Sequence, residues 1–166
     1  MGHSALPVRD IRLCAGAARA ATLKEMDEQR TISVMVVDQH QEVCEALARG
    51  LKGLPGFHVL SHTGNLVLAA ELAHQFRPDV IIADFKWSET PRPDALRWLA
   101  RVSPGTRMVV YTSYFTDGER EAFESAGAEH CLLKGLSLKE LANQLRKVAE
   151  REPTGSVADP QAPPAA

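Results

Sequence analysis

The stretch ISVMVVDQHQEVCEALARGL, residues 32–51, changes from one hydrophobic pattern to another at Asp38. Its first part, ISVMVV, is an almost unbroken apolar run, which predicts a β-strand covered on both faces. Its last part places Val43, Leu47 and Leu51 at helical spacing, which predicts a helix with these residues on one apolar stripe. A strand that leads through a short turn into a helix is a typical unit of an α/β fold. Asp38, a carboxylate at the end of a buried strand, is the first candidate functional residue.

The same alternation of strand and helix continues to about residue 150. Asn65 and Asp117 stand where side chains commonly cap the start of a helix, and Ser137 with Glu140 forms an S-x-x-E capping box. Five strands alternating with five helices predict a single-domain α/β fold with a doubly wound, parallel, five-stranded sheet. After the first strand and helix, strands are expected at residues 57–63, 79–84, 107–112 and 130–133, and helices at 66–76, 94–102, 117–125 and 138–148.

The composition of the 166 residues is that of a globular protein, with 45% hydrophobic residues and a net charge of −2. This charge gives no sign of nucleic-acid binding. No apolar run reaches the ~18–20 residues that span a membrane, so no membrane association is expected. Cys14, Cys44 and Cys131 are too far apart for a zinc site and are typical of reduced thiols, which favours a cytoplasmic location.

The two ends of the chain differ in composition from the middle. Residues 1–30 are rich in alanine and lack the apolar core of a secretory signal, so a flexible N-terminal arm is expected, with Met26 as an alternative start. Residues 151–166 are rich in proline and alanine and are expected to be a disordered tail. The folded domain is therefore assigned to residues 31–150, and no second domain is expected after it.

Four polar residues end predicted strands: Asp38 after MVV, Asp84 after VIIA, Thr112 after VVY and Lys134 after CLL. In doubly wound sheets the carboxyl ends of the strands line the functional crevice. Taken singly, each aspartate could be no more than a helix cap. Taken together, the carboxylates can hold Mg²⁺, while the hydroxyl and the ammonium group can bind phosphoryl oxygens. The strand ends therefore favour phosphoryl chemistry with a magnesium ion.

Other α/β chemistries lack their motifs. The chain contains no G-x-G-x-x-G turn for a dinucleotide and no G-x-x-x-x-G-K-[ST] loop for a nucleoside triphosphate. A phosphatase of the D-x-D type would need an acid two residues after Asp84, where Lys86 stands. A G-x-S-x-G nucleophile elbow is also missing, which argues against a hydrolase.

Four motifs, VVDQH, PDVIIAD, VVYTS and GAEHCLLKG, together resemble the receiver domain of two-component response regulators, over residues 32–149. The resemblance implies a flavodoxin-like receiver fold. It matches Asp84 to the phosphoacceptor, Thr112 to the conserved hydroxyl and Lys134 to the conserved lysine. Asp38 matches the first of two acids that hold Mg²⁺, and the backbone carbonyl of Lys86 matches a further metal ligand.

The sequence departs from this family at two positions. Gln39 stands where the second acid is usual, so one metal-ligand position carries a neutral amide and weak Mg²⁺ binding is expected. Cys131 stands where a Tyr or Phe usually turns inward on phosphorylation, so the switch is missing or relocated, with Tyr114 and Phe115 as nearby aromatic residues.

Two further residues near the site, Lys86 and His40, each have two possible roles. The side chain of Lys86 brings a positive charge close to the pocket or points into solvent. His40, next to the site, is expected to be a residue of the helix N-terminus in preference to a ligand or base.

The resemblance implies a stand-alone response regulator that accepts a phosphoryl group on Asp84 from a histidine kinase or phosphotransfer protein. It would act on a downstream protein target, with a homodimer possible, without direct DNA binding and without enzymatic turnover. The alternative, favoured by Gln39 and Cys131, is a pseudo-receiver that keeps the fold as an interaction module independent of phosphorylation.

Overall fold

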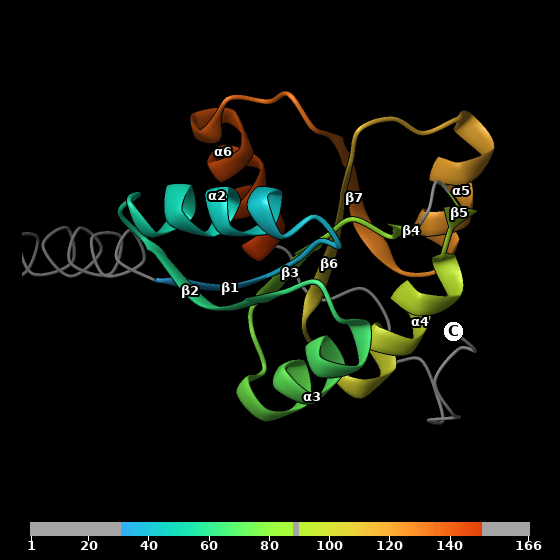
Figure 1. Ribbon diagram of the computed structural model, residues 1–166, viewed down its shortest axis with the longest axis horizontal. Helices are drawn as coiled ribbons and strands as arrows, with labels where there is room; N and C mark the ends of the chain where they lie inside the picture. The colour runs from blue at the N-terminus through green and yellow to red at the C-terminus, as the bar shows by residue number, and fades with distance from the viewer. Residues whose placement is uncertain (1–30, 88–89, 151–166) are drawn as a thin grey trace, which may run out of the picture. The chain divides into compact units, whose positions relative to one another are not determined.

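The computed structural model describes residues 31–87 and 90–150. Within them lies a parallel five-stranded sheet of order β2-β1-β3-β6-β7, together with a separate antiparallel ribbon, β4-β5 (Figure 1). The predicted doubly wound sheet of five strands with five helices is confirmed. The strands are β1 (Ile32–Val37), β2 (Phe57–Thr63), β3 (Val80–Ala83), β4 (Lys86–Trp87), β5 (Thr90–Pro91), β6 (Arg107–Thr112) and β7 (Ala128–Leu133). The helices are α2 (Gln41–Lys52), α3 (Leu66–Phe76), α4 (Pro93–Val102), α5 (Asp117–Ser125) and α6 (Leu138–Ala149).

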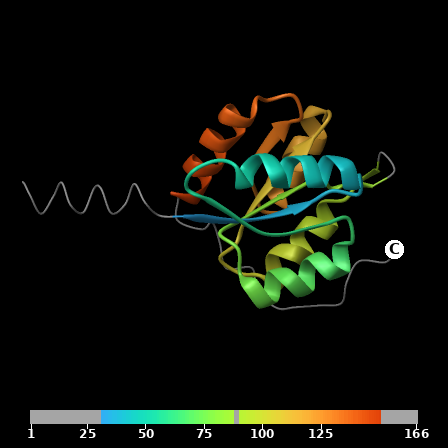
Figure 2. The same cartoon turned by 60° about the vertical axis from the view of Figure 1, so that its left-hand side comes forward.

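Helices cover both faces of the sheet (Figures 1 and 2). On one face α2 and α6 pack over a core that includes Val34 and Val36 of β1. On the other face α3, α4 and α5 pack over a core that includes Met35 and Val37 of the same strand. Alternate residues of β1 therefore enter opposite cores, which explains why this strand is apolar almost throughout.

The predicted capping residues agree with the structure except at α5. Asn65 Oδ1 accepts a hydrogen bond of 3.0 Å from the backbone N–H of Leu68, and Ser137 forms the predicted capping box. The prediction that Asp117 caps α5 is wrong, because Thr116 is the capping residue. Its extended backbone lets its hydroxyl accept from the N–H of Glu119 while the Glu119 carboxylate accepts from the N–H of Thr116 at 2.6 Å.

The apolar stripe of α2 is rotated relative to the prediction. Cys44, Ala48 and Leu51 are its buried residues, and Leu47 is partly buried against the same core. Val43 is 38% exposed, so its predicted place on the inward stripe is wrong. A shift of one residue turns a side chain by about 100° around a helix, and the small residues Cys44 and Ala48 let α2 lie close to the sheet.

The chain after β3 is anchored to the core before it leaves the sheet. Phe85 is fully buried, its ring centroid lies 6.3 Å from that of Phe123, and its carbonyl accepts a 2.8 Å hydrogen bond from the N–H of Arg92. The short β4-β5 ribbon lies between these two anchors. This arrangement fixes the backbone next to Asp84. The described residues include no helix with the length and apolar character needed to cross a membrane.

Candidate functional site

The four predicted strand-end residues stand at one edge of the sheet. Parallel pairing places Val37 of β1 beside Ala83 of β3, so the next residues, Asp38 and Asp84, leave the sheet side by side. The N–H of Asp84 extends the ladder with a 2.9 Å bond to the carbonyl of Val37. Strand register thus brings together two aspartates that are far apart in the sequence.

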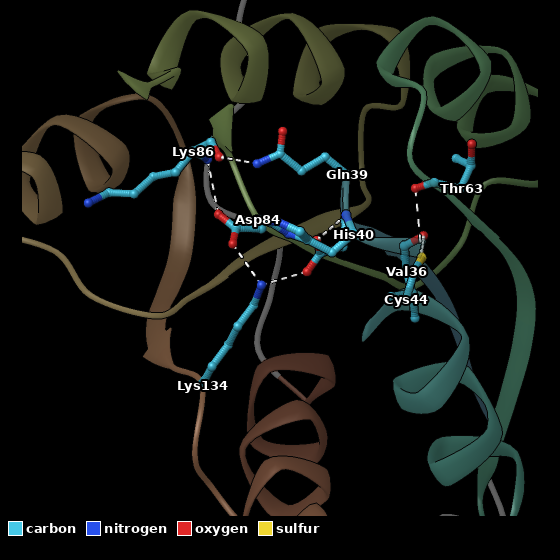
Figure 3. Close-up of polar contacts among 9 residues, drawn as sticks. Val36, Gln39, His40, Cys44, Thr63, Asp84, Lys86 and Lys134 are labelled. Atoms are coloured by element: carbon cyan, nitrogen blue, oxygen red, sulfur yellow. Dashed lines mark hydrogen bonds and ion pairs between the residues drawn. The ribbon is translucent and has the colours of Figure 1, made fainter. Parts of the chain in front are cut away.

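Lys134 joins the two carboxylates. Its Nζ lies 2.6 Å from Oδ2 of Asp38 and 2.7 Å from Oδ2 of Asp84 (Figure 3). The two aspartates are 4% and 7% exposed, and the lysine side chain is 18% exposed. Burial opposes the charge on Lys134, but its bonds to the two carboxylates outweigh this effect, so the pKa of Lys134 is raised. The ammonium group therefore stays charged in the folded protein at neutral pH.

Thr112 lies beside this ion-pair cluster. It is the last residue of β6 and is 1% exposed. Its carbonyl accepts a 2.7 Å hydrogen bond from the backbone N–H of Lys134, which holds the start of the lysine side chain at the edge of the sheet. The predicted grouping of Asp38, Asp84, Thr112 and Lys134 is what the structure contains.

The remaining carboxylate oxygens also have partners. Oδ1 of Asp84 accepts a 3.0 Å hydrogen bond from the backbone N–H of Lys86. Oδ1 of Asp38 accepts one of 2.9 Å from the backbone N–H of His40 and lies 3.1 Å from Nδ1 of the same residue. His40 is the N-cap residue of α2, as its predicted place suggested, but its contact with Asp38 was missed because the sequence does not give the direction of its ring.

Gln39 faces the backbone carbonyl that the family resemblance matches to a metal ligand. Its Nε2 donates a 3.1 Å hydrogen bond to the carbonyl oxygen of Lys86 (Figure 3). This bond puts an N–H donor at the position where the receiver family usually has a second acid. The predicted neighbourhood of Gln39, Asp84 and the Lys86 carbonyl is therefore present, with the amide nitrogen turned toward the carbonyl.

The donor set at this edge fits Mg²⁺ with one anionic ligand fewer than the family pattern. Asp38, Asp84 and the carbonyl of Lys86 are hard oxygen donors of the kind that Mg²⁺ prefers. No group of three or more His, Cys, Asp and Glu side chains suited to a metal occurs among residues 31–87 and 90–150. The ion would thus depend on two carboxylates, a backbone carbonyl and water, which suits weak binding.

The side chain of Lys86 takes neither of its two predicted directions. It is 4% exposed, so it does not point into solvent, and Figure 3 shows it directed away from Asp84 and Lys134. Its Nζ lies 3.2 Å from Oε2 of Glu119 and 3.6 Å from the centroid of the Tyr114 ring. A buried ammonium needs such partners, and an aromatic face together with a carboxylate supplies them.

These contacts join the site to the start of α5. The backbone N–H of Lys86 bonds to Asp84, while its side chain bonds to Glu119, the residue whose carboxylate caps α5 through Thr116. The bond from the Thr116 N–H, together with the contact to Lys86, outweighs desolvation and lowers the pKa of Glu119. One residue therefore touches both the candidate phosphoacceptor and the first turn of α5.

Cys131 packs inside the core of the α3–α4–α5 face. It is 6% exposed, and burial raises the pKa of its thiol to about 11. Of the two aromatic residues considered as substitutes for the usual inward-turning ring, Tyr114 is half exposed over Lys86. The other, Phe115, packs against Arg120, whose Cζ lies 4.7 Å from the centroid of the Phe115 ring.

Comparisons with known proteins agree with this geometry. The family model of the response regulator receiver domain matches residues 34–146. The response regulator GacA of Pseudomonas aeruginosa is 31% identical over 117 residues, which cover 70% of this chain and 55% of that protein. The transcriptional regulatory protein LiaR of Bacillus subtilis is 28% identical over 122 residues, which cover 74% of this chain and 58% of that protein. The chain thus spans little more than half the length of these curated relatives.

Solved structures show the same fold. The signal receiver domain of the putative response regulator NarL from Mycobacterium tuberculosis has a TM-score of 0.66 at 20% identity, covering 73% of this chain and 98% of that one. The response regulator domain of Thermotoga maritima CheB has a TM-score of 0.65 at 24% identity, covering 75% of this chain and 100% of that one.

Proposed function

The chain belongs to the response regulator receiver domain family, and we propose that it accepts a phosphoryl group on Asp84 from a histidine kinase or a phosphotransfer protein. The observation that carries this proposal is the position of the Lys134 ammonium group between the carboxylates of Asp38 and Asp84. Burying two carboxylates and a lysine together costs free energy, and phosphoryl transfer at this edge of the sheet would give that cost a purpose.

The transfer would use Asp84 as the nucleophile. A carboxylate oxygen forms a bond to phosphorus as the bond from phosphorus to the donor's imidazole nitrogen breaks, and the histidine leaves as the neutral imidazole after taking a proton from water. Lys134 carries three N–H donors, of which two hold the aspartates, so its third N–H can bind a phosphoryl oxygen. The hydroxyl of Thr112 lies at the same edge and can donate to another oxygen. A bound Mg²⁺, held by Asp38, Asp84 and the Lys86 carbonyl, would neutralise part of the phosphoryl charge.

The output would pass through a protein contact near α5. Lys86 links Asp84 to Glu119 at the cap of this helix, and Tyr114, which lies over the Lys86 ammonium, is 51% exposed. A change at Asp84 therefore has a short physical path to a surface that a downstream protein, or a second copy of the chain, can contact. By family analogy this surface comprises α5, β7 and α6.

A second candidate function rests on Gln39. Its amide satisfies the Lys86 carbonyl without a metal, and the buried thiol of Cys131 replaces the usual aromatic switch. Both features suit a pseudo-receiver that serves as an interaction module without phosphorylation.

Phosphodonor labelling separates the two functions. We expect the full chain, incubated with acetyl phosphate and Mg²⁺, to gain one phosphoryl group by mass spectrometry, with the modification at Asp84 after borohydride trapping. The Asp84→Asn variant should gain none, while the matched control Asp117→Asn, at an exposed position, should label like the parent. Absence of labelling in the parent would favour the pseudo-receiver, and labelling that persists in Asp84→Asn would refute the assignment of the acceptor.

A further inference from the structure

The side-chain amide of Gln39 keeps one N–H donor for a further partner. Its nitrogen, Nε2, carries two N–H donors, and among the described residues it binds one acceptor, the carbonyl of Lys86 at 3.1 Å. The opposite orientation of the amide would turn its oxygen toward the carbonyl oxygen, and two acceptors repel each other. The nitrogen therefore faces the site with its second N–H still available.

This donor lies next to the candidate phosphoacceptor. The carbonyl of Lys86 binds Nε2 of Gln39, and the backbone N–H of the same lysine binds Oδ1 of Asp84 at 3.0 Å. Lys134 binds the other carboxylate oxygen of Asp84, Oδ2, at 2.7 Å. Figure 3 shows the amide nitrogen of Gln39 and the ammonium nitrogen of Lys134 on opposite sides of the Asp84 carboxylate. A phosphoryl group on Asp84 would thus have an N–H donor on either side.

The donors at this edge of the sheet match the free oxygens of a phosphoryl group. Lys134 has a third N–H beyond its two bonds to the aspartates, and the hydroxyl of Thr112 lies at the same edge. Gln39 supplies a further donor and carries no charge. An acid at this position, as in the family pattern, would repel a phosphoryl group unless a cation lay between them. A neutral amide that donates a hydrogen bond has no such requirement.

We propose that Gln39 binds a phosphoryl oxygen through this N–H, so that Asp84 accepts a phosphoryl group without a divalent cation. This inference rests on the proposed function and adds how the site holds the transferred group. A carboxylate oxygen of Asp84 bonds to phosphorus as the donor's bond to phosphorus breaks, and Gln39 keeps both of its amide protons. Mg²⁺ remains an alternative, because a cation that takes the carbonyl of Lys86 displaces the amide from it.

The first test compares labelling of the full chain by acetyl phosphate, which leaves as acetate, in EDTA and in saturating Mg²⁺. We expect Asp84 to be labelled in EDTA at a rate within about tenfold of that with Mg²⁺, since a charge-assisted hydrogen bond replaces the cation. Labelling with Mg²⁺ but none in EDTA would overturn the inference and leave the proposed function intact. Labelling in neither condition would refute the proposed function and the inference with it.

Replacing Gln39 by methionine removes the donor and keeps the length of the side chain. Labelling of Gln39→Met in EDTA should fall by about tenfold, the effect of losing one charge-assisted hydrogen bond, and Mg²⁺ should restore it. The matched control Gln41→Met, at an exposed position of α2, should be labelled like the parent in both conditions. Unchanged labelling of Gln39→Met in EDTA would overturn the proposal. An equal loss with and without Mg²⁺ would also overturn it, because Gln39 would then only hold the segment after β3.

The NMR signals of the Gln39 side-chain amide provide a readout that does not depend on turnover. In ¹⁵N-labelled protein these signals are identified by their absence from the spectrum of Gln39→Met. Beryllofluoride binds an aspartate carboxylate as a copy of a phosphoryl group. In EDTA it should move one of the two Gln39 N–H signals downfield, as a new hydrogen bond does, and leave the amide signals of Gln41 in place. Failure of beryllofluoride to bind in EDTA, or binding that leaves the Gln39 signals unmoved, would overturn the proposed contact.

Discussion

The side-chain amide of Gln39 donates a 3.1 Å hydrogen bond to the backbone carbonyl of Lys86. The same residue, Lys86, donates its backbone N–H to Asp84, so Gln39 helps to hold the segment that positions the phosphoacceptor. An amide that bonds to this carbonyl competes with any cation for it. Gln39 therefore stabilises the segment after β3 through this hydrogen bond, and it is also the reason to expect weak Mg²⁺ binding.

Replacing Gln39 by aspartate should strengthen Mg²⁺ binding. Two unit charges ~4 Å apart interact by roughly 4 kcal/mol at an effective dielectric constant of about 20, and desolvation offsets much of this. We expect at least about tenfold tighter binding, a difference of ~1.4 kcal/mol, and faster labelling of Asp84. Calorimetric titration with Mg²⁺ measures the first effect, with Gln41→Asp, at an exposed position of α2, as the control. Equal affinities in parent and Gln39→Asp would mean that residue 39 does not face the ion.

Removing the Lys134 side chain should destabilise the fold and abolish phosphate-dependent partner binding. Asp38 and Asp84 are both nearly buried, so Lys134→Ala leaves two facing carboxylates without their cation. Breaking a buried pair in this way costs about 3 kcal/mol, which urea unfolding at neutral pH would measure. Lys139→Ala, at an exposed position of α6, should change the free energy of unfolding little. If the free energy of unfolding of Lys134→Ala falls by less than about 1 kcal/mol, the ion pairs of Lys134 contribute no more than surface ion pairs do, and the prediction is wrong.

The Lys86→Met substitution should loosen the first turn of α5. Methionine keeps most of the length of the buried side chain but loses both the ion pair with Glu119 and the contact with the Tyr114 ring. We expect amide hydrogen exchange in the first turn of α5 to rise several-fold, while exchange in α6 stays unchanged. Phosphodonor labelling should also no longer alter exchange in α5. If labelling changes α5 equally in parent and Lys86→Met, the signal leaves Asp84 by another route.

The sequence predicted those features that depend on local pattern. The apolar runs identified all five strands of the main sheet, and the parallel topology then brought Asp38, Asp84, Thr112 and Lys134 to one edge. The bond between Gln39 and the Lys86 carbonyl spans 47 residues and that between Lys86 and Glu119 spans 33, so no local pattern contains them. For the same reason both predictions for the Lys86 side chain, a position close to the pocket and a position in solvent, were wrong.

The error at α5 was of a different kind. Asp and Thr are both good capping residues, and Thr116 and Asp117 are two candidate caps one residue apart. The choice depends on the reciprocal bond from Glu119, three residues after Thr116, which the sequence does contain as T-x-x-E. Applying the capping-box pattern at residue 116, as at residue 137, would have identified the correct capping residue.

Cys131 should make the stability of the fold sensitive to alkaline pH. Burial raises the pKa of its thiol from 9.0 to about 11, so the folded chain holds the thiol proton more tightly than the unfolded chain. The contribution to stability is then fully present below about pH 9 and is lost as pH rises through about 11. A shift of this size corresponds to about 2–3 kcal/mol.

In Cys131→Val, which keeps an apolar side chain in the core, the fall in the free energy of unfolding between pH 8 and 11 should be smaller by about this amount. Lys134 and Cys44 also have raised pKa values, so they too contribute stability that is lost at alkaline pH. Both groups are present in the parent and in the variant, so their contributions cancel in the comparison. Urea unfolding at a series of pH values provides the comparison, and identical pH dependence in the two proteins would show that the thiol titrates freely in the folded state.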